Sequence, residues 1–335
     1  MAIFFGKRFQ PFSYFKFKDL KPFWTKNLCL ISEGNFCVSR DSSNTRYKRS
    51  LENNVPSESR ISTISQSYYD RQKFQYIMDN DSTQVLVGYW NSYYEYYGVK
   101  KSTNHTYFNS YYNQNLSGTC GDEYIWHTNS NSALYIKKTS DNKTITINNV
   151  LDVNGGGYDT NRGIVFQGID GNYYYCRFSY SGFYRLDLEN STYELLGGSS
   201  WSNMNNWTTH GFQQSKDLKY IFSENCYITY DIENRSIEGH SYPQQILDVI
   251  GSSSVHHIQA LYDNYLGIGL NDGRYLLCYY GDDIETCTVK EIQPYTREND
   301  TTIYHIWLSG HRKYWYCSNG AVDDTKSFGY YENIK

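Results

Sequence analysis

The chain has 335 residues, a formal net charge of −4 and 37 tyrosines, which supply much of its 39% hydrophobic content. With so few aliphatic residues, tyrosine must form part of the core, where each buried hydroxyl needs a hydrogen-bond partner or a route to solvent. No run of about 20 apolar residues occurs, so no membrane-spanning helix is predicted, and the few, dispersed basic residues argue against a nucleic-acid partner.

The N-terminal region is basic, since residues 1–50 contain ten Lys or Arg and three acidic residues. One interpretation makes residues 1–26 an arm that docks on an acidic partner surface, including the same face of a neighbouring copy. The other makes them a strand that closes the last sheet, with Ala2–Phe9 as the apolar candidate. Solubility and pairing within the molecule are the simpler explanation of the charge. The residues of this region that we predict to bind a partner are Lys7, Arg8, Phe9, Phe12 and Tyr14.

Residues 1–26 also lack a continuous apolar segment and a small-residue cleavage site, so we expect no secretory signal.

Seven stretches read as β-hairpins, each with two apolar or aromatic runs around a turn that is rich in Gly, Asn, Asp or Ser. Four are clear and three are looser. They are Asn27–Cys37, Gln84–Val99, Tyr124–Lys138, Ile164–Cys176, Gly211–Glu224, Leu266–Cys278 and Ile306–Cys317. Their turns lie near residues 34, 92, 130, 171, 216, 272 and 311, a mean separation of about 46 residues, which suits four-stranded repeats.

A second polar turn follows each hairpin, as in Asp187–Asn190 and Asp231–Asn234. Asp and Asn side chains accept hydrogen bonds from the backbone just downstream and so mark chain reversals. In the best-preserved copy we predict strands at 164–169, 173–178, 183–188 and 192–196.

With this pattern over about residues 27 to 332, the chain resembles the β-propeller families. The resemblance implies an all-β fold with one propeller domain at 27–335, preceded by the 1–26 extension that could complete the last blade. Seven blades fit best, with six or eight as alternatives. The Trp-Asp dipeptide of the WD40 family is absent, and no family's functional residues are carried over.

The eight cysteines are predicted to be free thiols, consistent with synthesis in a reducing cytoplasm. Cys37, Cys176, Cys278 and Cys317 take matching places in different hairpins and would be buried apart from one another. Cys29 and Cys37 are expected to face each other across one hairpin, and are the one pair close enough to consider.

We predict no catalytic residue, no metal site and no cofactor. His256 and His257 are the nearest approach to a metal-binding pair, but neighbours on a strand point to opposite faces unless a bulge intervenes. The Asp-rich turns lack the ligand spacing of a calcium loop. Carboxylates that converge from several blades, as glycoside hydrolysis would need, leave no signal in the sequence.

The leading functional prediction is a non-enzymatic structural and binding propeller, a bacteriophage virion component of the tail or receptor region. The chain is similar in composition to phage tail and fibre proteins. Its partners would be other virion proteins or symmetric copies of itself, and its location the virion after synthesis in the host cytoplasm. A cytoplasmic, cellular protein-binding scaffold is the first alternative, and a propeller that binds or hydrolyses a surface glycan is the second.

Trp201 and Trp207 complete the predicted partner-binding residues. They lie in the polar stretch Gly197–Trp207 between two predicted blades, where exposed rings would suit protein or sugar contacts. The alternative is that each ring is tucked under its own loop.

Overall fold

The computed structural model describes the backbone of strands from Lys21 onward and side chains in the C-terminal two thirds of the chain. The ranges with described side chains are 118–127, 133–140, 143–148, 150, 163–176, 182–198, 200, 212–294, 303, 305–308 and 310–312. The predicted binding residues Lys7, Arg8, Phe9, Phe12, Tyr14 and Trp207 lie outside the described residues.

The described strands form seven sheets, which we number in chain order and in which all strand pairs but one are antiparallel. Sheet 1 has β2 (Cys29–Ser32), β3 (Phe36–Arg40), β4 (Thr45–Ser50) and β5 (Ser57–Thr63). Sheet 2 has β6 (Lys73–Asp79), β7 (Thr83–Trp90), β8 (Tyr93–Lys100) and β9 (His105–Asn113). Sheet 3 has β10 (Ser117–Cys120), β11 (Tyr124–Thr128), β12 (Leu134–Lys138) and β13 (Thr144–Ile147). Sheet 4 has β14 (Gly163–Gln167), β15 (Tyr173–Arg177), β16 (Gly182–Asp187) and β17 (Thr192–Gly198).

The remaining three sheets include one with an added strand. Sheet 5 has β19 (Gln213–Gln214), β20 (Ile221–Phe222), β21 (Tyr227–Asp231) and β22 (Ser236–His240), and β18 (Ser200–Ser202) joins β22 in parallel. Sheet 6 has β23 (Val255–Leu261), β24 (Tyr265–Leu270), β25 (Tyr275–Tyr279) and β26 (Thr288–Ile292). Sheet 7 has β27 (His305–Leu308), β28 (Tyr314–Ser318), β29 (Ser327–Glu332) and β1 (Lys21–Trp24). A helix, α1 (Gln244–Ile250), and a 3₁₀ turn (Ile284–Thr286) complete the described elements.

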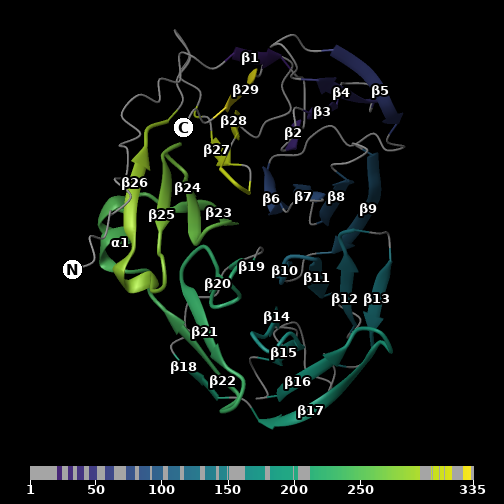
Figure 1. The fold of residues 1–335 in the computed structure, drawn as a ribbon, viewed down its shortest axis with the longest axis vertical. Helices are drawn as coiled ribbons and strands as arrows, with labels where there is room; N and C mark the ends of the chain where they lie inside the picture. The colour runs from purple at the N-terminus through teal and green to yellow at the C-terminus, as the bar shows by residue number, and fades with distance from the viewer. Residues whose placement is uncertain are drawn as a thin grey trace, which may run out of the picture.

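The sheets stand around a common centre, and the first strand of each lies nearest to it (Figure 1). This arrangement is a β-propeller, as the sequence predicted, and the all-β fold class is confirmed. The number of blades in the ring stays a prediction, because several connections lie outside the described residues.

Sheet 7 joins the first described strand of the chain to the last. Strand β1 pairs antiparallel with β29, with Lys21 opposite Tyr330 and Trp24 opposite Ser327. The strand that joins the last sheet is therefore Lys21–Trp24, while the candidate strand Ala2–Phe9 lies outside the described residues. The domain boundary at residue 26 stays a prediction.

All seven predicted hairpins are antiparallel strand pairs, but they do not all occupy the same place in their sheets. The turns near residues 92, 130 and 272 join second and third strands, whereas the other four join first and second strands. The gaps between first and second strands recur every 41 to 48 residues when measured between their midpoints. The seven turns predicted from the sequence were therefore unevenly spaced because they included turns after first strands and turns after second strands.

Strand position and strand register correct two statements about cysteines. Cys278 lies on a third strand, β25, and so does not match Cys176 on the second strand β15. In the first hairpin Cys29 pairs with Ser39, and Cys37 pairs with Ile31, so Cys29 and Cys37 are not directly opposite. The prediction of free thiols is confirmed for the five described cysteines, of which four are buried. These are Cys120, Cys176, Cys226, Cys278 and Cys287.

Tyrosine forms part of the core as predicted, and the buried residues Tyr174 and Tyr242 bring their hydroxyls to polar partners. Tyr174 donates to Asp170 Oδ2 at 2.6 Å, and Tyr242 donates to the Ser223 carbonyl at 2.6 Å. Because a phenol ring brings a large apolar surface together with one donor, such pairs let tyrosine replace aliphatic residues.

The predicted Asp–Asn turns are also present, between third and fourth strands. Asp187 accepts hydrogen bonds from the backbone N–H and the side-chain amide of Asn190, at 3.0 and 2.8 Å. Asp231 and Asn234 repeat this arrangement at 2.9 and 2.8 Å. Hydrogen bonds from the asparagines lower the pKa of both carboxyl groups, since they favour the charged form.

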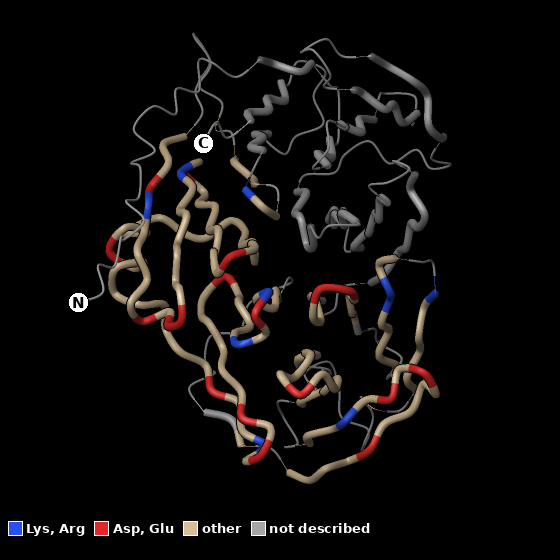
Figure 2. The backbone as a smooth tube through the Cα atoms, viewed as in Figure 1, with Lys and Arg blue, Asp and Glu red and all other residues tan. Residues whose placement is uncertain are grey.

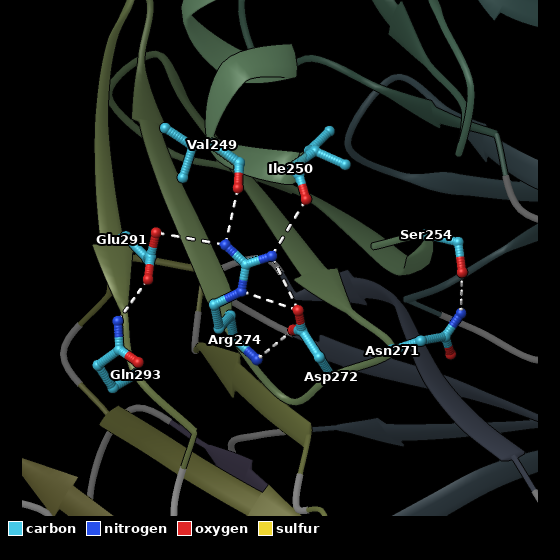
Figure 3. A network of polar contacts seen from close by, with 8 residues as sticks. All are labelled: Val249, Ile250, Ser254, Asn271, Asp272, Arg274, Glu291 and Gln293. Atoms are coloured by element: carbon cyan, nitrogen blue, oxygen red, sulfur yellow. Dashed lines mark hydrogen bonds and ion pairs between the residues drawn. The ribbon is translucent and has the colours of Figure 1, made fainter. Parts of the chain in front are cut away.

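Helix α1 packs against β26, and Arg274 fastens its C-terminal end (Figure 3). The Arg274 guanidinium donates to the carbonyls of Val249 and Ile250 at 2.7 and 3.1 Å and to Asp272 at 2.8 Å. Carbonyls at a helix C-terminus lack partners within the helix, and a cation there also suits the helix dipole. This network ties the connection between sheets 5 and 6 to the turn before β25.

Candidate functional site

Successive antiparallel strands reverse direction, so each sheet presents two sets of turns at opposite ends. We call the end that carries the turns after first and third strands the AB face. The BC face carries the turns after second strands and the connections between sheets. Polar contacts between turns of different sheets identify the AB face as the candidate functional site.

Three side chains from three sheets meet on the AB face. Lys216, in the turn after β19, forms an ion pair with Asp122, in the turn after β10. The hydroxyl of Tyr262, in the turn after β23, donates a hydrogen bond to Asp122 Oδ2 at 2.5 Å. The ammonium group of Lys216 also lies 4.8 Å from the centre of the Tyr262 ring, a cation–π contact.

Sheet 7 adds its first turn to this group. The His311 ring stacks on Tyr262 with centroids 4.1 Å apart and planes 7° apart. Arg312 pairs with Asp263 Oδ2 at 2.9 Å, and its guanidinium lies 3.9 Å from the centre of the Tyr265 ring. We call Asp122, Lys216, Tyr262, Asp263, His311 and Arg312 the AB cluster. Its cations are mostly covered, with 11% of the Lys216 side chain exposed, while 69% of the Asp263 side chain is exposed.

Contacts between first strands explain why these turns converge. The Thr119 N–H donates to the Phe212 carbonyl at 2.9 Å, and the Gln214 N–H donates to Thr119 Oγ1 at 2.8 Å. Strands β10 and β19 therefore lie side by side, although sheet 4 comes between them in the chain. The turns that follow these strands carry Asp122 and Lys216.

Three buried glutamines join the first strands of neighbouring sheets, and we call Gln213, Gln214 and Gln259 the amide belt. Gln213 donates to the Ile258 carbonyl and accepts from the Ala260 N–H, both at 2.8 Å. Gln259 donates to the Leu308 carbonyl and accepts from the Leu308 N–H, both at 2.9 Å. An amide side chain offers one donor and one acceptor group, so each glutamine substitutes for a peptide of a neighbouring strand.

Gln214 links the belt to the AB cluster. Its side chain bonds the backbone N–H and carbonyl of Gln167 in β14, at 2.9 and 2.6 Å. The same side-chain oxygen accepts from the Gly121 N–H at 2.8 Å, beside Asp122. The belt thus fixes both the first strands and the turn that presents Asp122.

Carboxylates outnumber cations in the described turns of the AB face. The acidic residues are Asp122, Glu123, Asp170, Glu189, Asp217, Glu233, Asp263, Asp282, Asp283 and Glu285. The basic residues are Lys143, Lys216, Lys219, Arg235 and Arg312. The described turns and connections of the BC face contain Glu224, Asp248, Asp272 and Arg274. Figure 2 shows acidic segments both near the centre and around the rim.

One of these turn carboxylates has a shifted pKa. Burial raises the pKa of Asp170, but hydrogen bonds from Tyr174 and Asn172 outweigh that effect and leave it below its usual value. Asp170 is therefore ionised at neutral pH and adds to the negative charge of the face.

His256 and His257 contact each other, contrary to the expectation that they point to opposite faces. Strand β23 has a register shift between Val255 and His257, and the two Nδ1 atoms lie 2.9 Å apart. His257 Nε2 lies 3.0 Å from the Ile306 carbonyl, and His256 stacks on His305 with centroids 3.7 Å apart. Among the described residues, no group of three or more His, Cys, Asp or Glu side chains is placed to hold a metal ion.

The AB cluster was missed at the sequence level, and none of its residues was predicted as a site. Trp201 lies in β18, where its backbone pairs with Ile237. Its side chain is not among those that the structure describes. A signal was nevertheless present, because an aspartate recurs in four successive first turns at intervals of 46 to 48 residues. These residues are Asp122, Asp170, Asp217 and Asp263.

No protein-family model matches the sequence, and no curated protein matches it. Solved structures show similarity in fold. Virginiamycin B lyase from Staphylococcus aureus is 13% identical at a TM-score of 0.50, covering 94% of this chain and 99% of that one. The Swd1 β-propeller domain from Myceliophteria thermophila is 7% identical at a TM-score of 0.52, and the match covers 94% of this chain and 100% of that one. U3-55K is 6% identical at a TM-score of 0.51, and the match covers 93% of this chain and 98% of that one.

At these identities the comparisons establish the propeller fold alone. One similar structure is named as a lyase, so the lack of catalysis stays a prediction. Nothing in the comparisons supports the predicted virion role or the resemblance in composition to phage proteins. No helix among the described residues is both long and apolar enough to cross a membrane.

Proposed function

We propose that this protein is a protein-binding propeller scaffold, and that the AB face is its binding face. The observation that carries the proposal is the convergence of charged and aromatic side chains from sheets 3, 5, 6 and 7 in the AB cluster. Such side chains, held on rigid turns, are the groups that protein interfaces use as anchors.

The contacts within the cluster favour binding. Lys216 and Arg312 are each paired with a carboxylate and an aromatic ring, so their positions are fixed before a partner arrives. A preorganised surface loses less conformational entropy on association than a mobile one. The excess of carboxylates around the cluster suits a partner with a basic surface, and it speeds encounter with such a partner.

The test compares two variants with the same change in net charge. The first removes three exposed carboxylates of the AB face, by Glu123→Gln, Glu233→Gln and Asp282→Asn. The control removes three carboxylates elsewhere, by Glu194→Gln, Glu238→Gln and Asp248→Asn. Partners captured by the full chain from its source cells are identified by mass spectrometry, and the dissociation constant of a recovered protein is then measured with each variant.

We expect the AB-face variant to bind that protein about tenfold more weakly or worse, since loss of charge complementarity lowers the association rate. The control should bind like the unmodified chain. Equal weakening by the two variants, or no weakening by the first, would show that the AB face is not the binding face.

A further inference from the structure

The topology of sheet 7 determines where the N-terminal segment meets the propeller. Strand β1 is the fourth strand of that sheet, and Lys21, its first residue, pairs with Tyr330 near the end of β29. Strand β29 is a third strand and ends at the AB face. Residues 1–20 therefore precede a strand that starts at the AB face.

The sequence of residues 1–20 complements that face in charge. It contains Lys7, Arg8, Lys16 and Lys18 against a single acidic residue, Asp19, and it is rich in phenylalanine. The described AB-face turns have the opposite balance, with ten carboxylates and five cations. Opposite charge at this density gives both attraction and orientation.

The AB face also offers apolar contacts for phenylalanine rings. Ile169, in the turn after β14, is 76% exposed. Its neighbour Gly168 lies against the side chain of Ile232 from the next sheet, and there is open space beside Gly171. An apolar side chain with carboxylates around it is a suitable place for an aromatic residue of a basic segment.

We propose that residues 1–20 dock across the AB face of their own molecule, with their lysines and Arg8 against its carboxylates and their phenylalanines against Ile169 and the AB cluster. This inference rests on the proposed function, because it assigns an internal occupant to the proposed binding face. A partner then has to displace the segment, which makes the N-terminus a competitive regulator of binding.

Length and tethering favour docking within one molecule. Three strand spacings of about 4.8 Å each separate β1 from β27. Even with the dimensions of a random coil, about 20 residues span about 25 Å, enough to reach the centre of the ring. A tether of this length gives an effective concentration in the millimolar range, so docking on a second copy is the weaker competitor at micromolar protein.

The test is zero-length carbodiimide crosslinking of the full-length protein, which joins lysine amines to carboxylates that they touch. Crosslinked peptides are mapped by mass spectrometry at low salt and at 1 M salt. An equal mixture of isotopically light and heavy protein shows whether each crosslink lies within one molecule. We expect Lys7, Lys16 and Lys18 to crosslink to AB-face carboxylates such as Glu123, Asp263 and Asp282, within one molecule, and with lower yield at 1 M salt because charges are screened.

A variant that keeps all the reactive lysines measures the role of the anchors. Arg8→Glu with Phe9→Ser and Phe12→Ser should lower the crosslink yield about fivefold or more, as loss of aromatic and arginine anchors does at interfaces. The matched control, Gln10→Asn with Ser13→Ala, should leave the yield unchanged.

Crosslinks that run to the BC face, that join light to heavy protein, or that do not form would overturn the inference. Each of these results leaves the proposed function standing, because the crosslinking needs no partner. Conversely, the AB-face carboxylates could crosslink to the segment while their removal leaves partner binding unchanged. That pair of results would contradict the proposed function and leave this inference standing.

Discussion

The centre of the propeller and its AB face both join neighbouring sheets through polar side chains, but they do so with different chemistry. At the centre, the amide belt bonds uncharged glutamine side chains to buried backbone groups. On the AB face, the contacts are between charged and aromatic groups, and the carboxylates of the ion pairs are partly exposed, 38% for Asp122 and 69% for Asp263. Losing the hydrogen bonds of a buried amide group is costly, whereas partly exposed ion pairs contribute little to the free energy of folding. The centre is therefore suited to holding the ring, and the AB face to binding.

Gln259→Leu should have the largest effect, because it removes the amide that joins β23 to β27. The substitution leaves the N–H and carbonyl of Leu308 and the hydroxyl of Tyr275 without Gln259 as a partner. We expect the free energy of unfolding to fall by about 2–4 kcal/mol, since several buried polar groups lose hydrogen bonds together. Urea denaturation measures the change.

Gln244→Leu, on the exposed side of α1, is the control for that prediction and should change stability by about 0.5 kcal/mol or less. If the two variants lose the same stability, the belt does not hold the first strands together.

His257 gives the centre a dependence on pH. Burial lowers its pKa, and the charges of His256 and His305 lower it further. Below about pH 6.5 the unfolded chain binds a proton that the folded chain does not, so stability is lost as the pH falls.

We expect this group to contribute a slope of up to about 1.4 kcal/mol per pH unit below pH 6.5. Thermal unfolding between pH 8 and 5 measures it, and His257→Gln should reduce the slope by that amount. An unchanged slope in the variant would assign the dependence to other groups.

On the AB face, Lys216→Met should cost less. It removes the ion pair with Asp122 but keeps an apolar chain beside Tyr262, and Asp122 retains the hydrogen bond from that tyrosine. We expect a loss of about 1 kcal/mol, typical of a partly exposed pair. Chemical denaturation tests this, and a loss as large as that of Gln259→Leu would show that the AB cluster holds the fold as firmly as the belt does.

The smallest effect on folding should come from the exposed carboxylates of the AB face. Glu123→Gln, Glu233→Gln and Asp282→Asn should each alter stability by about 0.5 kcal/mol or less, as exposed substitutions usually do. Differential scanning calorimetry measures this. A larger loss would mean that these residues serve the fold, and would remove the contrast between centre and face.

The sequence predicted the propeller because hairpins and Asp–Asn turns are local. The bonds of Asp187 and Asp231 reach only three residues along the chain, so their signal survives without tertiary information. The AB cluster and the belt depend on contacts between residues far apart in sequence, such as Tyr262 with Asp122 and Gln259 with Leu308. Glutamine and lysine in short strands and turns look ordinary until the ring brings them together.

The pairing of β1 with β29 also bears on how the ring assembles and opens. Lys21 and Tyr330 are joined across almost the whole chain, so this contact has a large loop-closure cost and should form late in folding. The start of β1 and the end of β29 lie at the same end of sheet 7, on the AB face. A force applied to the two termini would therefore peel the strands apart one residue pair at a time, and the propeller would open at this seam before its other sheets come under load.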